Sequence, residues 1–254
     1  MKKNNLLIRF FLTFFMLLNM AEVLAATNWQ ALKPGLEYTL LTPDYIHPWA
    51  KIHVFRFDLA QYRLAITLAK DHKVQTSTVQ ELVEKEHALI GVNGGFFTPE
   101  LKPIGLRIQD GKTLSPLKNT SWWGIFYIQD GKPYLASPKN YPHSPNITFA
   151  VQGGPRLVSE GEIPNLKPGI AERTAIGIDH EGKVLLLATE NTPLATEDLA
   201  EIMRAPLSED GLNCANALNL DGGTSTQLFA QIGNFELNIP GYNTITDTVM
   251  VLAK

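Results

Sequence analysis

Two glycine-rich turns, each directly after a short apolar run, constrain this chain more than any other feature of its sequence. The apolar runs are 88–92 and 217–220, and the turns begin at Asn93-Gly94-Gly95 and at Asp221-Gly222-Gly223. Short apolar runs bounded by turn residues are typical of buried strands. Paired glycines permit positive φ angles and close approach of the backbone to a ligand. We therefore expect two strand ends to present Asn93 and Asp221 in one shared site.

Asp221 is the strongest candidate for chemistry. A carboxylate at the end of a buried strand is partly desolvated yet open to a ligand on one side, which suits a nucleophile or a base. An Asp-Gly pair alone more often caps its own turn, as we expect at Asp110 and Asp130. Asp221 differs because glycines and hydroxyl residues follow it as far as Thr226. For Asn93 the alternative interpretation is an Asn-Gly hairpin turn.

Three further positions fit the same site. Gln152-Gly153-Gly154-Pro155 follows the apolar run 147–151 and is a candidate third wall of the cleft. Arg173 opens a β-rich run, where a guanidinium can clamp an anion with two hydrogen bonds, although a surface arginine is the alternative. Glu190 ends the run 184–189 and is either a second carboxylate of the site or a solvated loop residue.

The remaining pattern predicts an α+β fold: a single domain with a large mixed or antiparallel sheet and few helices. Thr78 and Glu81 form a capping-box signature for a helix to about residue 86, and Thr196 is the expected cap of a helix over 197–204. Two irregular stretches, 137–145 and 161–172, are too short to link separate domains, and the first is a candidate rim of the cleft. Strands are expected at 52–57, 64–68, 88–92, 147–151, 173–179, 183–189, 217–220, 226–230, 235–239 and 246–252.

The N-terminal segment is typical of a secretory signal peptide. Basic residues precede the apolar run 10–18, and Val23 and Ala25 occupy the positions that a signal peptidase reads. The apolar run is short for a membrane-spanning helix, which disfavours the alternative of an uncleaved anchor. We expect residues 1–25 to be removed and the mature chain to be exported, periplasmic or extracellular, with no stable membrane insertion.

Charge and motif content exclude several classes of function. The net charge of −3 becomes −5 when residues 1–25 leave with three positive charges and one negative charge. A mildly acidic chain without a basic patch is not expected to bind nucleic acid. No phosphate-binding P-loop, Gly-x-Ser-x-Gly elbow or His-Glu-x-x-His motif occurs, so we expect no cofactor and no metal. Cys214, the single cysteine, is expected to be a buried, inert thiol.

Four motifs together resemble one known family. They are Asn93-Gly94-Gly95-Phe96-Phe97, Gly153-Gly154-Pro155-Arg156-Leu157-Val158, Arg173-Thr174-Ala175-Ile176-Gly177 and Asn219-Leu220-Asp221-Gly222-Gly223-Thr224-Ser225. In this order, over residues 85–252, they are similar to the phosphodiester glycosidases related to the mannose-6-phosphate uncovering enzyme, whose bacterial relatives are described as exopolysaccharide-associated. Two positions depart from the family pattern: Thr224 replaces a third glycine, and Glu190 stands where an Asp-Gly pair is common.

The resemblance implies a mixed α/β domain that hydrolyses a sugar-1-phosphodiester at the anomeric carbon. Together with the signal pattern, it divides the chain into three regions. Residues 1–25 are the signal peptide, and residues 85–254 are the phosphodiester glycosidase-like region. The strands expected in 26–84 belong to the same domain, and the sequence assigns them no role. The implied partner is a carbohydrate phosphodiester, and the sequence gives no oligomeric state. The predicted catalytic residues are Asp221, Arg173 and Glu190. The predicted substrate-binding residues are Asn93, Gly94, Gly95, Gly153, Gly154, Asn219, Gly222, Gly223, Thr224 and Ser225.

Within this scheme, Asp221 attacks C1 of the sugar or activates water. Arg173 and the N–H groups of one glycine pair hold the phosphate, while amide and hydroxyl side chains bind sugar hydroxyls. A phosphodiester leaves as a stabilised anion, so the reaction needs less help from a second carboxylic acid than other glycosidases do. Two alternatives stay open. One is a secreted glycan-binding protein without turnover; the other is a phosphodiesterase that cuts a P–O bond, a class that usually needs clustered metal ligands.

Overall fold

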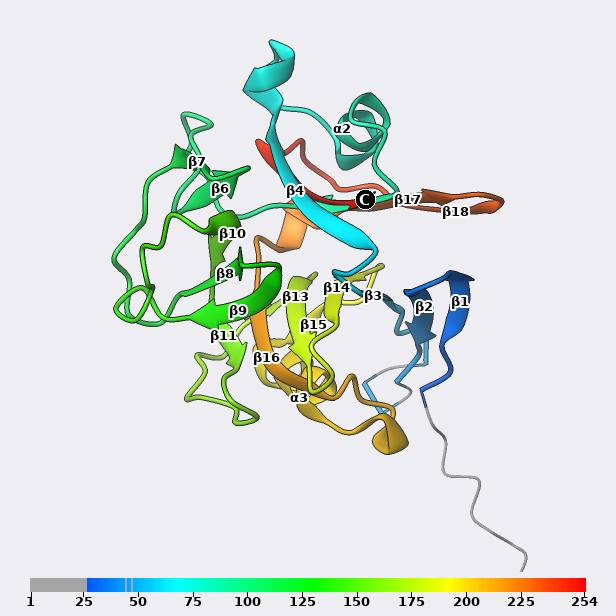
Figure 1. Cartoon of the computed structure of the whole chain (residues 1–254). Coiled ribbons are helices and arrows are strands. Elements are labelled where there is room, and N and C mark those ends of the chain that lie inside the picture. The colour runs from blue at the N-terminus through cyan, green and yellow to red at the C-terminus, as the bar shows by residue number, and fades with distance from the viewer. Residues whose placement is uncertain (1–26, 44, 47) are drawn as a thin grey trace, which may run out of the picture.

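The structure is a computed structural model that describes residues 27–43, 45–46 and 48–254. The predicted signal peptide lies outside the described residues. The described residues form one α+β domain (Figure 1), and the strand pairings of its sheets are antiparallel. The two α-helices among these residues are short, so the fold class expected from the sequence is confirmed. Among the described residues, no helix combines the length and apolarity that crossing a bilayer requires.

A seven-stranded sheet forms one side of the molecule. Its strand order is β1-β2-β3-β14-β13-β16-β11. The hairpin expected over 173–189 is present as β13 and β14, in which Thr174 pairs with Ala188 and Ile178 pairs with Val184. The strands are β1 (Gln30–Lys33), β2 (Leu36–Leu41), β3 (Ile52–Phe57), β14 (Val184–Thr189), β13 (Thr174–Asp179), β16 (Cys214–Asn219) and β11 (Arg156–Val158).

A five-stranded sheet lies across the first one, in the order β18-β17-β5-β19-β4. Its strands are β18 (Phe235–Ile239), β17 (Leu228–Ile232), β5 (Ile90–Asn93), β19 (Asp247–Ala253) and β4 (Tyr62–Leu68). The N-terminal strands enter both sheets, because β3 pairs with β14 and β4 pairs with β19. Residues before 85 thus contribute to the scaffold that carries β5 and β16.

A second five-stranded sheet closes the remaining side, in the order β7-β6-β10-β8-β9. Its two hairpins turn at Asp110-Gly111 and Asp130-Gly131, where all four residues have positive φ. That geometry is the hairpin turn expected of an Asp-Gly pair. The strands are β7 (Lys112–Ser115), β6 (Arg107–Gln109), β10 (Ile147–Gly153), β8 (Gly124–Gln129) and β9 (Lys132–Ala136); β12 (Ile170–Ala171) and β15 (Leu194–Ala195) form a small separate pair.

Helices α2 and α3 cover outer sheet faces (Figure 1). Helix α2 (Val79–Lys85) begins with the predicted capping box of Thr78 and Glu81. Helix α3 (Thr196–Arg204) differs from the prediction, because Ala195 and not Thr196 is its N-cap. The hydroxyl of Thr196 instead accepts a hydrogen bond from Arg173 and donates one to the carbonyl oxygen of Gly169.

The main apolar core lies where the three large sheets face one another. It includes Phe55 of the first sheet, Val249 of the second and Phe126 of the third, all nearly inaccessible to solvent. A second cluster, which contains Cys214, fills the space between the seven-stranded sheet and α3. Burial raises the pKa of the Cys214 thiol well above its ordinary value, which agrees with the inert thiol predicted from the sequence.

Candidate active site

The two glycine-rich turns meet through direct hydrogen bonds. The backbone N–H of Asp221 donates to the carbonyl oxygen of Gly94 (3.2 Å), and the Asn93 side-chain amide donates to the carbonyl oxygen of Asp221 (2.7 Å). The Asn93 side-chain oxygen accepts from the Thr174 hydroxyl (2.6 Å) and from the backbone N–H of Gln227 (3.0 Å). Asn93 is inaccessible to solvent. It therefore joins the two turns, in place of the predicted contact with a sugar hydroxyl.

Beside this junction lies a cavity of about 460 Å³. Its wall includes six of the residues predicted from the sequence: Gly154, Arg173, Asn219, Asp221, Gly222 and Gly223. The other lining residues are Phe96, Trp122, Pro155, Asn165, Lys167 and Ala171. All four sequence motifs thus converge, together with the 161–172 loop, around a single cavity.

Asp221 is half-buried at the wall of this cavity. Burial raises the pKa of its carboxyl group, and the nearby Asp247 carboxylate adds to this rise. Hydrogen bonds from the Ser225 hydroxyl and from the Gly222 N–H (2.9 Å), with the charge of Arg107, oppose it. The balance is a carboxyl group that is easier to protonate than an ordinary aspartic acid and that faces a ligand-sized space.

Asn219 supplies an unpaired acceptor to the same wall. Its side-chain amide nitrogen donates to the carbonyl oxygens of Gly154 (3.0 Å) and Leu220. Its side-chain oxygen is buried and has no hydrogen-bond partner among the described residues. Because a buried acceptor without a partner is costly, a hydroxyl donor of a ligand is a natural partner for this oxygen.

Arg173 lines the cavity, but two of its three guanidinium nitrogen atoms, Nε and Nη2, are already bonded to the protein. Nε donates to the carbonyl oxygen of Leu194 (3.0 Å), and Nη2 donates to the Thr196 hydroxyl (3.0 Å) and to the carbonyl oxygen of Gly169. Only 8% of Arg173 is exposed, and burial lowers the pKa of its guanidinium. The predicted bidentate clamp on an anion is therefore not available from the Nε and Nη2 pair.

The glycines of the first turn make room for a buried ion pair. Arg107 donates from Nε to Asp247 (2.5 Å), and both side chains are almost fully buried. A Cβ atom on Gly94 would lie 2.6 Å from Cγ of Asp247, and one on Gly95 would lie 2.8 Å from Cζ of Arg107. Gly94 and Gly95 do not line the cavity. The structure therefore requires glycine at these positions because of the close packing on the ion pair, and not for contact with a ligand.

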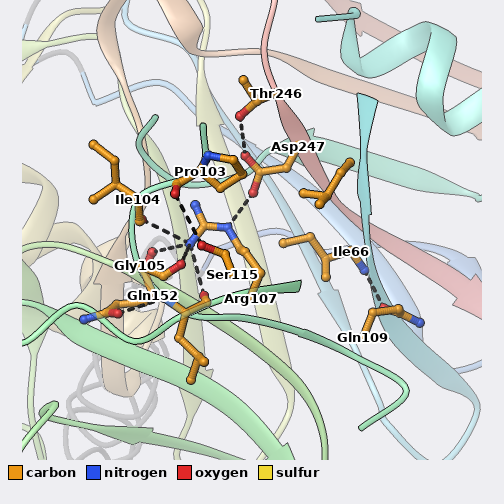
Figure 2. A network of polar contacts seen from close by, with 12 residues as sticks. Ile66, Pro103, Ile104, Gly105, Arg107, Gln109, Ser115, Gln152, Thr246 and Asp247 are labelled. Atoms are coloured by element: carbon orange, nitrogen blue, oxygen red, sulfur yellow. Dashed lines mark hydrogen bonds and ion pairs between the residues drawn. The ribbon is translucent and has the colours of Figure 1, made fainter. Parts of the chain in front are cut away.

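Figure 2 shows how Arg107 ties the third sheet to this pair. Nη1 donates to carbonyl oxygens that include those of Leu106 and Gln152 (both 3.1 Å), while Asp247 also accepts from the Thr246 hydroxyl (3.0 Å). Sequence reasoning missed this pair, although each member opens a strand, Arg107 in β6 and Asp247 in β19. A charge at the start of an apolar strand is the signal that could have found it.

Five other predicted residues lie outside the cavity wall. Gly153 is packed against the backbone of Asn219, and Ser225 is buried beside Asp221. The hydroxyl and carbonyl oxygens of Thr224 accept hydrogen bonds from Asn243, whose segment folds over this turn. These three residues support the Asp221 turn and do not line the cavity that would hold the sugar. The remaining two, Gly94 and Gly95, pack on the ion pair.

Glu190 is not brought to the cavity. Its carboxylate lies 3.0 Å from Nε2 of His53 and 3.3 Å from Nζ of Lys51, and Nδ1 of that histidine is 2.8 Å from the hydroxyl of Tyr38. Burial raises the pKa of Glu190, but the hydrogen bonds and charges of His53 and Lys51 outweigh it and leave the pKa lowered. Glu190 therefore belongs to an ion-pair cluster on β3, which corrects its predicted place beside Asp221.

Aromatic side chains form another part of the wall. Phe96 packs against Trp123 in a tilted arrangement with a centroid distance of 5.0 Å, and Trp122 packs edge-on to Trp123 at 5.8 Å. Trp122 is 48% exposed and lines the cavity, whereas Trp123 is buried. Phe96 belongs to the first motif, while nothing in the sequence indicated Trp122. A flat apolar face of this kind suits a sugar ring.

Within the part of the chain that the structure describes, no group of three His, Cys, Asp or Glu side chains is arranged to hold a metal ion. The cavity wall carries a single carboxylate, Asp221, with two cations, Lys167 and Arg173. This arrangement provides a base or nucleophile next to positive charge and amide groups. It is the arrangement of a site that acts on a polar, anionic ligand.

The comparisons with known proteins agree with this fold. A model of the phosphodiester glycosidase (NAGPA) family matches residues 86–252. The chain therefore belongs to the phosphodiester glycosidase family. The Escherichia coli K-12 protein YigE, described as uncharacterized, is 32% identical over 150 residues, which span 54% of this chain and 56% of YigE. The match thus covers little more than half of that relative's length.

Solved structures share the fold at low sequence identity. The catalytic domain of zebrafish N-acetylglucosamine-1-phosphodiester alpha-N-acetylglucosaminidase, described as auto-inhibited by its pro-peptide, has a TM-score of 0.66 and 19% identity over 90% of this chain and 87% of that domain. A hypothetical protein from Synechocystis has a TM-score of 0.59 and 13% identity, over 90% of this chain and 64% of that one. These structures show that the architecture is shared.

Proposed function

We propose that this protein hydrolyses a sugar-1-phosphodiester at the bond between the anomeric carbon and the phosphate oxygen. The observation that carries the proposal is Asp221, a half-buried carboxylate on the wall of a cavity that also holds two cations. Membership of the phosphodiester glycosidase family supports the same reaction. The zebrafish enzyme is named an N-acetylglucosamine-1-phosphodiester alpha-N-acetylglucosaminidase, and that name gives the chemical class to test first.

In the proposed reaction, the C1–O bond breaks and its electron pair stays on the phosphate oxygen. The oxygen of water becomes bonded to C1, either directly, with its proton passing to ionised Asp221, or after Asp221 itself has bonded to C1 and is displaced. The leaving phosphate gains one negative charge, which the cationic side of the cavity stabilises. The unpaired oxygen of Asn219 accepts a hydrogen bond from a sugar hydroxyl, and the indole of Trp122 stacks on a ring.

The test is a screen of methyl diesters of hexose 1-phosphates and of N-acetylhexosamine 1-phosphates, with release of methyl phosphate as the readout. Asp221→Asn is expected to lower kcat by about 100- to 10,000-fold, while Asp110→Asn, at a hairpin turn far from the cavity wall, keeps kcat. Unfolding curves of both variants report whether the fold is intact. Normal turnover by folded Asp221→Asn would remove Asp221 from the mechanism.

Reaction in ¹⁸O-labelled water identifies the bond that breaks. Label in the sugar supports cleavage at C1, whereas label in the phosphate would indicate cleavage of a P–O bond. Saturable binding of every diester without any product would instead indicate a glycan-binding protein. Sensitivity of turnover to chelators would support the P–O alternative, because that chemistry depends on metal ions.

We also propose that the protein is exported and acts on a glycan outside the cytoplasm, such as an exopolysaccharide. The support is the signal pattern of residues 1–25, with its basic start, its apolar run and its small residues at 23 and 25. N-terminal sequencing of the protein purified from its native cell fractions tests this. A first residue close to Ala26 in a periplasmic or secreted fraction is the expected result, and an intact Met1 in the cytoplasm would contradict it.

A further inference from the structure

The two cations on the cavity wall differ in what they contact. Arg173 is 8% exposed, and its Nε and Nη2 atoms donate to Leu194, Thr196 and Gly169. A side-on bidentate contact with an oxyanion uses these same two nitrogen atoms. To bind a phosphate in that way, Arg173 would have to release three acceptors, two of which are backbone carbonyl oxygens.

Lys167, unlike Arg173, has a charged group without a bond to the described part of the protein. It is exposed, it lines the cavity, and it forms no hydrogen bond or ion pair with any described residue. It lies in the 161–172 loop, two residues before Gly169, whose carbonyl oxygen is the acceptor for Nη2 of Arg173. The ammonium group of Lys167 thus keeps all three N–H donors for a ligand, while Arg173 fixes the backbone that carries it.

We propose that Lys167 binds the phosphate of the substrate and that Arg173 is a positioning residue that holds the Lys167 loop against the cavity. This assignment rests on the proposed function. In this assignment the phosphate is contacted by the ammonium group of Lys167, at the end of a long side chain, and not by the guanidinium of Arg173 as predicted from the sequence. A diester phosphate has two non-bridging oxygens and one negative charge, and a lysine recognises such a group without demanding one orientation.

The position of the charge also gives Lys167 a part in the reaction. When the C1–O bond breaks, the diester monoanion becomes a monoester whose departing oxygen carries the bonding electron pair. A cation beside the phosphate stabilises this added charge more than it stabilises the bound substrate. Loss of Lys167 is therefore expected to lower kcat as well as to raise KM.

The first experiment measures kinetics with the methyl diester that the substrate screen selects. Lys167→Gln is expected to lower kcat/KM by roughly 10- to 100-fold, because it removes a charge-assisted contact. Lys167→Arg, which keeps the charge, is expected to retain most of the activity. The matched control is Lys139→Gln, which removes an exposed lysine that lies outside the cavity wall. Equal kcat/KM for Lys167→Gln and Lys139→Gln would overturn the assignment.

A second experiment does not depend on turnover. Binding of dimethyl phosphate, an inert diester anion, is followed by ³¹P NMR line broadening in the full chain and in the same variants. Weaker binding by Lys167→Gln but not by Lys139→Gln supports the assignment, even if no tested sugar diester is hydrolysed and the proposed function fails. Unchanged binding by Lys167→Gln, or no binding by the native protein, overturns it.

The role of Arg173 is tested by a double-mutant cycle on dimethyl phosphate affinity. If Arg173 acts through the Lys167 loop, Arg173→Gln weakens binding in the native background but has little further effect in Lys167→Gln. If the guanidinium contacts phosphate itself, the two losses add, and the positioning role is wrong. Hydrogen exchange at 165–171 provides the structural readout, since release of Gly169 from Arg173 is expected to speed exchange there in Arg173→Gln alone.

Discussion

The side-chain amide of Asn93 donates a hydrogen bond to the backbone carbonyl oxygen of Asp221, 2.7 Å away. This contact joins the ends of β5 and β16, which belong to different sheets, through two residues that are 128 positions apart in the chain. The turn that carries the candidate catalytic carboxylate is therefore held by an amide that is inaccessible to solvent. A displacement of the buried Asn93 side chain would therefore also displace Asp221.

Substitution Asn93→Ala is expected to reduce both stability and activity. It removes the donor to Asp221 and leaves the Thr174 hydroxyl and the Gln227 N–H without their acceptor. Leaving buried polar groups unpaired costs about 1–3 kcal/mol for each group. Chemical denaturation measures the loss of unfolding free energy, and kcat on the selected diester measures the displacement of Asp221.

Asn140→Ala is the matched control, because Asn140 is exposed and its side chain forms no hydrogen bond with the described residues. It is expected to match the native protein in both measurements. If Asn93→Ala were as stable as Asn140→Ala, the three hydrogen bonds of Asn93 would not be the link between the turns.

A methyl group at Gly95 is expected to destabilise the protein. The added Cβ would lie 2.8 Å from both Cζ of Arg107 and the carbonyl oxygen of Gln152, which are buried and held by other bonds. Overpacking of a filled interior costs about 1–3 kcal/mol. Thermal unfolding of Gly95→Ala is compared with that of Gly169→Ala, whose new methyl group would meet its nearest neighbour at 3.6 Å. A native melting temperature for Gly95→Ala would show that the ion pair can move aside.

The sequence predicted the fold class and the convergence of the turns because both depend on local patterns. The hairpin turns at Asp110 and Asp130, the capping box at Thr78 and the strand ends before Asn93 and Asp221 are encoded by neighbouring residues. Glycine pairs after apolar runs indicate that something packs closely against the turn. They do not reveal what that neighbour is: Gly222 packs against the carbonyl oxygen of Glu172, and Gly95 packs against the side chain of Arg107.

The errors all concern partners that are distant in the chain. Gly94 and Gly95 pack on Asp247 and Arg107, and no local pattern around the first turn shows this. Lys167 lies in a loop without a motif, so its place on the cavity wall follows only from the tertiary fold. Glu190 was placed by its position at a strand end. A strand end fixes the edge of the sheet but not the side toward which a side chain points.

Glu190→Gln is accordingly expected to leave turnover within about twofold of the native value. Its carboxylate contacts Lys51 and His53 and does not line the cavity. The effect on stability is expected to be small, about 0–1 kcal/mol, because Lys51 is largely exposed. Steady-state kinetics beside Asp221→Asn, the variant expected to be inactive, checks this. A loss of the size seen for Asp221→Asn would return Glu190 to the mechanism.

The acidic limb of the pH–rate profile reports the ionisation of Asp221. Burial raises the pKa of this carboxyl, while the hydrogen bond from Ser225 lowers it. Substitution Ser225→Ala removes a donor that favours the ionised form, so the acidic limb of kcat/KM is expected to move to higher pH. Thr226→Ala is the control, because Thr226 is also buried, and its hydroxyl has no hydrogen-bond partner among the described residues. A limb that moves to lower pH, or moves equally in both variants, would contradict this reading of the profile.

The raised pKa of Asp221 also predicts how stability changes with pH. Between the ordinary pKa of an unfolded aspartic acid and the higher pKa in the folded state, the folded protein binds more protons. Unfolding free energy from this group therefore falls as pH rises through that window and stays lower above it. Asp221→Asn keeps the acceptor for the Gly222 N–H but has no charge to desolvate. The melting temperature of the variant minus that of the native protein is therefore expected to increase as pH rises from about 3 to 7. Each kcal/mol of unfolding free energy corresponds to about 2–4 °C. Calorimetric scans at several pH values measure this difference. If it stayed constant or decreased with rising pH, the protein environment would not disfavour the charge on Asp221.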